Sequence, residues 1–208
     1  MIHCFGILDR KIEGGVKSNP HYGVWSRMIE RCYSEASLLR NPQYSGVSVC
    51  EEWRYFSNFE RWSADRFVDG WTFDKDMINL TGNIYSSEAC CYLPQELNKS
   101  ILDASATRSS FGLGVWYKKP SCKMISERNK PFVAEINNKK LGSFKTPEEA
   151  HRCWQRAKVE NLLSLAVNWF GKVDHQAIEG LVERAYLIEV DMKNRNKTHT
   201  VSKMRRVE

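Results

Sequence analysis

The 208-residue sequence contains no long apolar run, and its N-terminus, MIHCFGILDRK, lacks the cationic start, apolar centre and cleavage site of a secretory signal. The first absence argues against a membrane-spanning helix, and the second argues against export. The apolar and charged fractions, 42% and 27%, are ordinary for folded proteins and argue against wholesale disorder. We therefore expect a folded intracellular protein that acts in the cytoplasm and has no membrane partner.

The sequence also lacks a Cys-x-x-Cys pair, although it contains seven cysteines. An odd number of scattered cysteines in an intracellular protein favours free thiols, most of them buried as small apolar groups. A zinc site built from Cys32, Cys50 and either Cys90 or Cys91 remains an alternative.

Histidine is absent from residues 73–100, FDKDMINLTGNIYSSEACCYLPQELNKS, a segment that otherwise has the layout of a small nuclease site. Asp74 and Asp76 are two residues apart, so in a strand they would share one face and could hold Mg²⁺. Asn98, in an expected short helix, offers an amide group for catalysis. Lys75 cannot replace a histidine as general base, because an exposed lysine stays protonated near neutral pH.

Metal-assisted cleavage of a phosphodiester needs a carboxylate and imidazole ligand set and a base beside the attacking water. The five histidines of the sequence all lie outside residues 73–100. Among them, His21, next to an expected helix start, is the one that we consider for folding back onto the acidic pair. Asn83 is a further source of an amide ligand.

Basic residues are unevenly distributed along the chain. Residues 108–158 contain 12 Lys and Arg against 4 Asp and Glu, and residues 193–208 contain 6 against 1. The segments 1–107 and 159–192 are net acidic. A concentrated basic block beside a basic tail fits a polyanion partner, while a solvated lysine-rich surface is the alternative interpretation.

The N-terminal half is rich in aromatic residues at helical spacing. Trp25, Met28, Ile29 and Cys32 recur at the spacing of one helix face, and a second amphipathic helix is expected within residues 53–66. We interpret this aromatic stripe as core packing and not as a ligand pocket.

The C-terminal half predicts three strands and two helices. The segment 111–119 reads as a strand, and residues 132–144 read as a hairpin around an Asn137-Asn138 turn. Thr146, followed by Pro147 and Glu149, forms a capping box that begins a helix extending toward Gly171.

Beyond that helix, Asp174 is an expected N-cap for a second one. Its inward-facing residues should be Ile178, Leu181, Val182, Ala185 and Ile188. The small polar residues 103–110 are the best linker candidate, and the tail 193–208, which has no apolar period, is expected to be mobile.

Several short pieces stand at fixed offsets within residues 111–160: Gly114-Val115, Ala134-Glu135-Ile136, Leu141-Gly142, Phe144, Thr146 and Glu148-Glu149-Ala150. In this order they resemble the APETALA2-type DNA-binding domain of plant ethylene-responsive factors and many phage homing endonucleases. The resemblance implies a three-stranded antiparallel sheet packed on one helix. It also implies that the sheet, and not the helix, enters the major groove of DNA.

Carried over residue by residue, the resemblance implies DNA contacts at Trp116, Lys118, Glu135, Asn137 and Lys140. The two lysines suit phosphates or guanine, Asn137 suits adenine, and Glu135 suits the amino group of cytosine. Trp116 stands where the plant domains carry arginine, so it would stack or contact a sugar. A register slip of one residue would instead turn Trp116 and Glu135 to the packing side of the sheet.

The patterns W-S-x-M-I-x-R-C-Y, Y-S-G-V-x-V-C-E-E-W and D-K-D-x-x-x-x-x-G-N-x-x-Y-S-x-E resemble segments of phage proteins that combine such a module with an HNH-type nuclease. This resemblance implies that Asp74 and Asp76 hold the metal and act in catalysis with Asn98. Three alternatives stay open: an altered but active site, a degenerate copy without cleavage, or a protein-interaction module.

Together these patterns predict an α+β protein in three parts: an HNH-like, ββα-metal-related or degenerate nuclease domain at 1–105, an APETALA2-type domain at 106–170, and a helix with a basic tail at 171–208. The expected function is that of a homing-endonuclease-like phage protein in the infected host cell. It would bind double-stranded DNA through its C-terminal sheet and, if active, cleave it with Mg²⁺. The alternative is an inactive DNA-binding regulator or an interaction module, and the sequence leaves the oligomeric state open.

Overall fold

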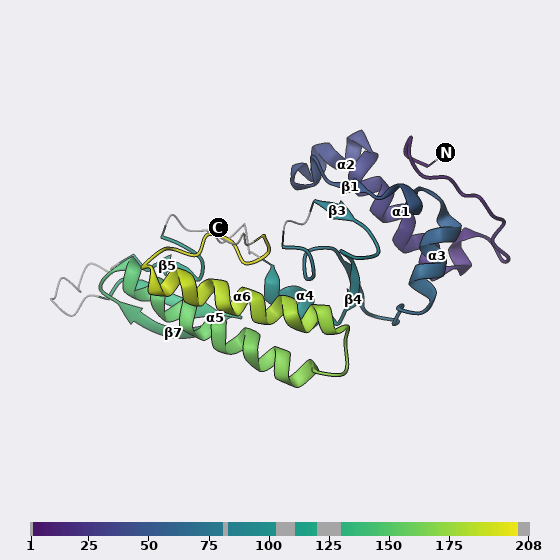
Figure 1. The fold of residues 1–208 in the computed structure, drawn as a ribbon. Coiled ribbons are helices and arrows are strands. Elements are labelled where there is room, and N and C mark those ends of the chain that lie inside the picture. Colours follow the sequence, from purple (N-terminus) through teal and green to yellow (C-terminus); the bar gives the residue numbers. More distant parts are fainter. Residues whose placement is uncertain (1, 81–82, 103–110, 120–129, 204–208) are drawn as a thin grey trace. The chain divides into compact units, whose positions relative to one another are not determined.

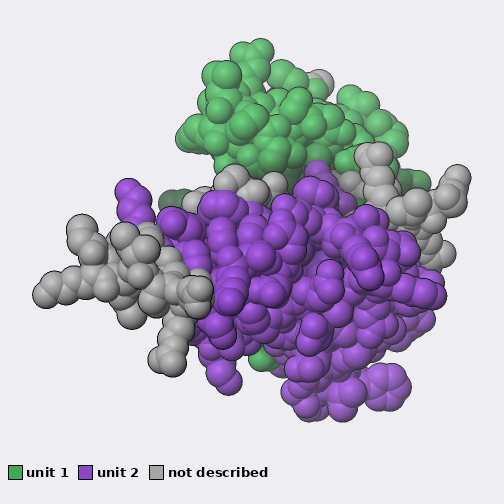
Figure 2. Space-filling view, turned by 90° about the vertical axis from the view of Figure 1, so that its left-hand side faces the viewer, with its two compact units in different colours: residues 1–98 green, residues 99–208 purple. Residues whose placement is uncertain are grey.

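A computed structural model describes residues 2–80, 83–102, 111–119 and 130–203 of the chain. It forms two compact units, residues 1–98 (unit 1) and residues 99–208 (unit 2), which are coloured separately in Figure 2. Both contain helices and short strands, so the predicted mixed α+β class is confirmed. The predicted linker at 103–110 lies outside the described residues.

Most of the helical elements of unit 1 lie within residues 16–64 (Figure 1). Asn19 caps the longest of them by accepting a hydrogen bond from the Tyr22 backbone N–H, and Pro20 occupies the first helical position, where a missing N–H costs nothing. The helical elements are η1 (Val16–Ser18), α1 (Pro20–Tyr33), α2 (Glu35–Arg40), η2 (Pro42–Tyr44), η3 (Glu51–Arg54) and α3 (Phe56–Ala64); α4 (Gln95–Ile101) spans the boundary between the two units.

Four very short strands complete unit 1. β1 (Ser48–Val49) pairs in parallel with β3 (Ile84–Tyr85), and β2 (Thr72–Asp74) pairs antiparallel with β4 (Cys91–Leu93). The antiparallel pair is followed directly in sequence by α4.

Aromatic residues build the core of unit 1, as the sequence predicted. Trp25, Phe56 and Phe59 are fully buried, and the Trp25 indole N–H donates to the Trp53 carbonyl at 2.7 Å, so its burial leaves no unpaired donor. Each fully buried apolar side chain of this size contributes about 1.5–3 kcal/mol through its removal from water. The predicted stripe Trp25, Met28, Ile29 and Cys32 is the buried face of α1.

A three-stranded antiparallel sheet lies at the start of unit 2, in the order β5 (Val115–Tyr117), β6 (Phe132–Ile136), β7 (Lys139–Phe144). Asn137 and Asn138 join β6 to β7 with φ values of 50° and 61°. Two consecutive left-handed residues match the twist of a tight hairpin, and asparagine tolerates them better than most residues do. The predicted hairpin is therefore confirmed.

Two long helices follow the sheet, α5 (Pro147–Trp169) and α6 (His175–Lys193), and they pack side by side (Figure 1). The predicted caps are confirmed: Thr146 and Glu149 form a reciprocal capping box, and Asp174 accepts from the Gln176 N–H. One predicted inward residue of α6 is wrong, because Val182 is 44% exposed while its neighbour Leu181 is fully buried.

Gly114 fixes the approach of α5 to the sheet. A Cβ atom at this position would lie 1.8 Å from Cδ1 of Trp154, and Gly114 also has a φ of +69°. Only glycine satisfies both conditions without movement of the helix or the strand.

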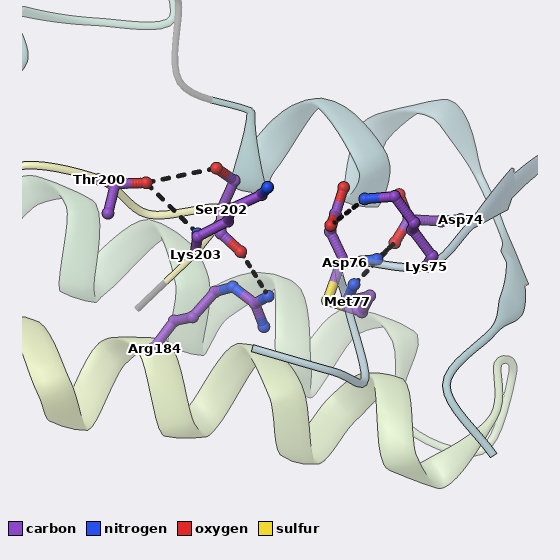
Figure 3. Close-up of polar contacts among 8 residues, drawn as sticks. All are labelled: Asp74, Lys75, Asp76, Met77, Arg184, Thr200, Ser202 and Lys203. Atoms are coloured by element: carbon purple, nitrogen blue, oxygen red, sulfur yellow. Dashed lines mark hydrogen bonds and ion pairs between the residues drawn. The ribbon is translucent and has the colours of Figure 1, made fainter. Parts of the chain in front are cut away.

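The C-terminal segment is packed as far as Lys203, which corrects the prediction of a mobile tail for residues 194–203. Thr198 and Val201 are buried, and the guanidinium of Arg184 donates to the Val201 carbonyl at 2.9 Å. It also donates to the Ser202 carbonyl at 3.3 Å (Figure 3). Charge-assisted bonds to backbone carbonyls hold the segment, so no apolar period was needed to order it.

Candidate nucleic-acid interface

The pairing of β5 with β6 places two of the predicted DNA-contact residues, Trp116 and Glu135, on one side of the sheet. Trp116 is opposite Val133, which is itself buried, and because residues alternate along a strand, Glu135 lies on the same side as Val133. The other side carries Val115 and Ala134, which are paired and almost completely buried. Trp116 is 41% exposed. The alternative register, in which Trp116 would pack beneath the sheet, is therefore not the one that the structure has.

Trp116 and Glu135 are joined by a hydrogen bond. The indole Nε1–H donates to Oε2 of the carboxylate at 3.2 Å, diagonally across β5 and β6. This bond occupies one carboxylate oxygen and orients the side chain, while leaving the other oxygen able to accept.

Lys118 and Lys140 flank this pair. Lys118 follows the end of β5, two residues from Trp116, and its backbone N–H donates to the Pro131 carbonyl. Lys140 is the partner of Glu135 in β7. Both lysines are exposed, and among the described residues neither has a carboxylate within ion-pair distance. Their positive charges therefore face solvent.

The hairpin end of the sheet adds further polar groups. Asn137 is exposed in the turn, and Lys139, which sequence reasoning did not select, is exposed beside Lys140. The sequence contained an indication of this, because two lysines directly follow the Asn-Asn turn and residues at the end of a hairpin lie near solvent. Arg152 and Arg156 are exposed on α5.

The acidic segment of unit 1 has a different geometry from the one predicted. β2 ends at Asp74, so Asp74 and Asp76 are not successive residues on one strand face. One oxygen of the buried Asp74 carboxylate accepts from the backbone N–H groups of Asp76 at 2.9 Å and Met77 at 2.7 Å (Figure 3). Burial raises the pKa of this carboxyl group. Asp74 thus stabilises the turn that follows β2.

Asp76 is neutralised by its neighbour. Its Oδ1 lies 2.6 Å from Nζ of Lys75, which is itself buried and lies 5.7 Å from the ring centroids of Tyr44 and Tyr85. The expectation of an exposed lysine at this position is therefore wrong. Cation–π contacts and the ion pair together compensate for removing the ammonium group from water.

The other residues that the sequence suggested for catalysis are His21, Asn98 and Asn83. His21 shares a hydrogen bond of 2.9 Å with the Ser63 hydroxyl and packs edge-on against Phe67, and burial lowers its pKa. Asn98 is half-buried in α4, and Asn83 is exposed. Within the described ranges, no group of three or more His, Cys, Asp or Glu side chains is arranged to hold a metal ion.

Burial favours the thiol form at Cys32, Cys50 and Cys90, three of the four cysteines considered for the alternative zinc site. Burial raises the pKa of Cys32 and of Cys50 to about 11 in each case, and it raises that of Cys90 well above its ordinary value. Zinc binds thiolates, so these environments disfavour it.

No family model, curated protein or solved structure matches the chain. In the part of the chain that the structure describes, no helix has the length and apolar character needed to cross a membrane.

Proposed function

We propose that the chain is a DNA-binding protein that holds duplex DNA against the exposed side of β5, β6 and β7. The observation that carries this proposal is the bonded Trp116–Glu135 pair between two lysines that have no described acidic partner. Lysines at the flanks suit phosphates, and an oriented carboxylate suits a base amino group. The resemblance of residues 111–160 to APETALA2-type domains supports the same interface.

A narrow sheet fits this role for a geometric reason. The major groove of B-DNA is about 12 Å wide and admits a two-stranded β-ribbon. The tight Asn137-Asn138 turn keeps one end of the sheet slim and carries Lys139 and Lys140 toward its rim. The net positive charge of residues 108–158 draws the module toward a polyanion.

The test is binding of a labelled 30-base-pair duplex of mixed sequence, followed by fluorescence anisotropy. The Lys118→Ala/Lys140→Ala variant should bind at least about tenfold more weakly, because two charge-assisted phosphate contacts are removed. A control with Lys11→Ala/Lys99→Ala removes the same charge from exposed positions outside the sheet. Equal affinity of the two double variants would contradict the interface.

We propose further that unit 1 does not cleave DNA through a metal held by Asp74 and Asp76. The order β2, β4, α4 supports descent from a ββα-type nuclease, with Asp74 on the first strand and Asn98 on the helix. The side chains do not fit the Mg²⁺ that such descent implies. Asp74 is buried and accepts from two backbone N–H groups, and Asp76 is paired with Lys75.

A supercoiled-plasmid assay with Mg²⁺ or Mn²⁺ tests this second point. We expect intact plasmid under conditions where the duplex is bound. Nicking that is present in the wild type and lost in both Asp74→Ala and Asp76→Ala would overturn it.

A further inference from the structure

Unit 1 has a surface pocket that the sheet interface does not use. Its volume is about 590 Å³, and one wall is the start of α1 while the other is the turn between α3 and β2. Pockets of about 300–1,000 Å³ are the usual size for small-molecule sites. All residues that line it belong to unit 1 and are described.

The wall from α1 contains a glycine in the interior of the helix. Gly23 has an ordinary negative φ, so the backbone does not require glycine there. A glycine in a helix interior destabilises the helix by comparison with alanine. The guanidinium of Arg27, one turn later, lies over the vacant position, with Nη1 3.4 Å from where a Cβ would be. Gly23 and Arg27 therefore lie beside each other on the pocket wall.

Two cations line this pocket. Lys17 and Arg27 are both exposed, and in the described part of the chain neither has a carboxylate within ion-pair distance. Asp69 also lines the pocket, and it is not paired with either cation. Unpaired cations at a concave surface favour an anionic ligand, and arginine favours phosphate in particular.

The opposite wall is aromatic. Phe67 and Trp71 are half-buried in the turn that lines the pocket, and Phe67 is held edge-on against His21 at 5.1 Å and Tyr92 at 5.5 Å. Aromatic side chains in a basic groove provide stacking surfaces for nucleobases. Asp69 can accept from a base amino group at the same wall.

We propose that this pocket binds a nucleoside phosphate, with the phosphate at Lys17 and Arg27 and the base against Phe67 and Trp71. Inorganic phosphate alone would leave the aromatic wall unused, and an uncharged aromatic compound would leave both cations unpaired. A nucleoside phosphate uses both. It is either a free nucleotide or one unit of a single-stranded nucleic acid, since both present the same groups. The proposal does not depend on DNA binding by the sheet.

The test measures binding of deoxynucleoside monophosphates by calorimetry and of a fluorescein-labelled single-stranded five-nucleotide DNA by anisotropy. Both are carried out on the full chain that carries Lys118→Ala and Lys140→Ala, so that the sheet contributes little. Binding of the free nucleotides identifies a small-molecule site, and binding of the oligonucleotide alone identifies a single-strand site. The unphosphorylated nucleosides and inorganic phosphate should each bind at least about tenfold more weakly than the preferred ligand.

Two variants make the test specific to the pocket. Arg27→Gln should weaken binding by about tenfold or more, whereas Arg61→Gln, at an exposed position of α3 that does not line the pocket, should not. Gly23→Ala should bind as tightly as the chain without it and raise the midpoint of thermal unfolding, because a Cβ there makes only an ordinary contact with Arg27 and alanine favours the helix. Loss of binding in Arg27→Gln at an unchanged unfolding midpoint excludes unfolding as the cause.

The proposal is overturned if neither ligand binds, or if Arg27→Gln binds as tightly as the chain without it. It is also overturned if binding is seen only when Lys118 and Lys140 are restored, because the ligand would then belong to the sheet.

Discussion

The indole nitrogen of Trp116 lies 3.2 Å from a carboxylate oxygen of Glu135, and this hydrogen bond links two strands on the exposed side of the sheet. It gives an acidic residue a fixed orientation on a surface that is otherwise basic. A carboxylate in this setting repels phosphate and suits a base edge that donates a hydrogen bond. The pair therefore bears on which sequences bind, while the lysines beside it bear on how tightly they bind.

The first prediction concerns this pair. Trp116→Phe keeps an aromatic surface and removes the N–H donor, which frees the Glu135 side chain. Affinity for mixed-sequence duplex should fall by less than about tenfold, since such a hydrogen bond contributes about 0.5–1.5 kcal/mol. Base preference should change in the same way as in Glu135→Gln, when both are compared by selection from randomised duplexes. Unchanged preference in both variants would remove Glu135 from base recognition.

A second prediction concerns the contact between β5 and α5. Gly114→Ala should lower the free energy of unfolding by about 2–5 kcal/mol, because it adds a collision with Trp154 to a left-handed backbone. Gly171→Ala is the matched control, since Gly171 has a φ of +71° and open space around it. It should lose only about 1–2 kcal/mol in the same denaturant titration. Equal losses would mean that Trp154 moves aside freely.

Asp74 provides a third prediction. Asp74→Ala leaves the backbone N–H groups of Asp76 and Met77 without their acceptor and should cost about 1–3 kcal/mol. Asp74→Asn keeps an oxygen acceptor and should be less destabilised. A metal-binding role would instead make both variants equally deficient in metal-dependent activity while changing stability little.

The pH dependence of the Asp74 variants has a defined sign. Burial raises the pKa of the Asp74 carboxyl group in the folded protein above 3.8. The protonated group therefore stabilises the fold fully below pH 3.8, and this stabilisation is lost as pH rises through the folded pKa. The free energy of unfolding of the wild type, relative to Asp74→Asn, should therefore decrease between acidic and neutral pH. A relative stability that increases over this range would contradict the burial.

His151 gives the fourth prediction. Its Nδ1 lies 3.0 Å from the Leu113 carbonyl and its Nε2 accepts from the Thr198 N–H at 3.1 Å, an arrangement that requires the neutral ring with hydrogen on Nδ1. Burial lowers its pKa below 6.5, against the opposite effect of the hydrogen bond to the Leu113 carbonyl; the nearby charges of Lys197 and His199 lower the pKa further, and Asp191 raises it. The neutral His151 ring therefore stabilises the fold above pH 6.5, and this stabilisation is lost as pH falls through the folded pKa.

The measurement is the free energy of unfolding between pH 7.5 and pH 5, with His151→Gln and His175→Gln compared. His151→Gln should flatten the pH dependence, and His175→Gln, which changes an exposed ring, should leave the wild-type slope. Hydrogen exchange at Thr198 should accelerate as the pH falls, relative to the intrinsic rate. An unchanged slope in His151→Gln would show that the ring does not control the packing of residues 194–203.

The parts of the fold that could be predicted have local causes. The capping box of Thr146 and Glu149, the Asp174 cap and the Asn137-Asn138 hairpin each depend on residues within a few positions of one another. Local hydrogen bonds and φ preferences require particular residue types at fixed spacings, and these can be recognised in the sequence.

The parts that could not be predicted depend on distant partners. Lys75 is buried because Tyr44 and Tyr85 come from other parts of unit 1, and residues 194–203 are ordered because Arg184 lies on the preceding helix. The pairing of β1 with β3 involves two residues in each strand, too few for an alternating pattern. The pocket beside α1 has walls from residues 16–27 and 67–71, which are far apart in the sequence, so no local pattern predicted it.

The most direct test of the sheet interface is the salt dependence of duplex binding. The logarithm of the association constant should fall linearly with the logarithm of salt concentration, because phosphate contacts release counterions. The account predicts a slope that is smaller by about two in Lys118→Ala/Lys140→Ala than in the wild type, and an unchanged slope in Lys11→Ala/Lys99→Ala. Equal slopes in the wild type and Lys118→Ala/Lys140→Ala would contradict it.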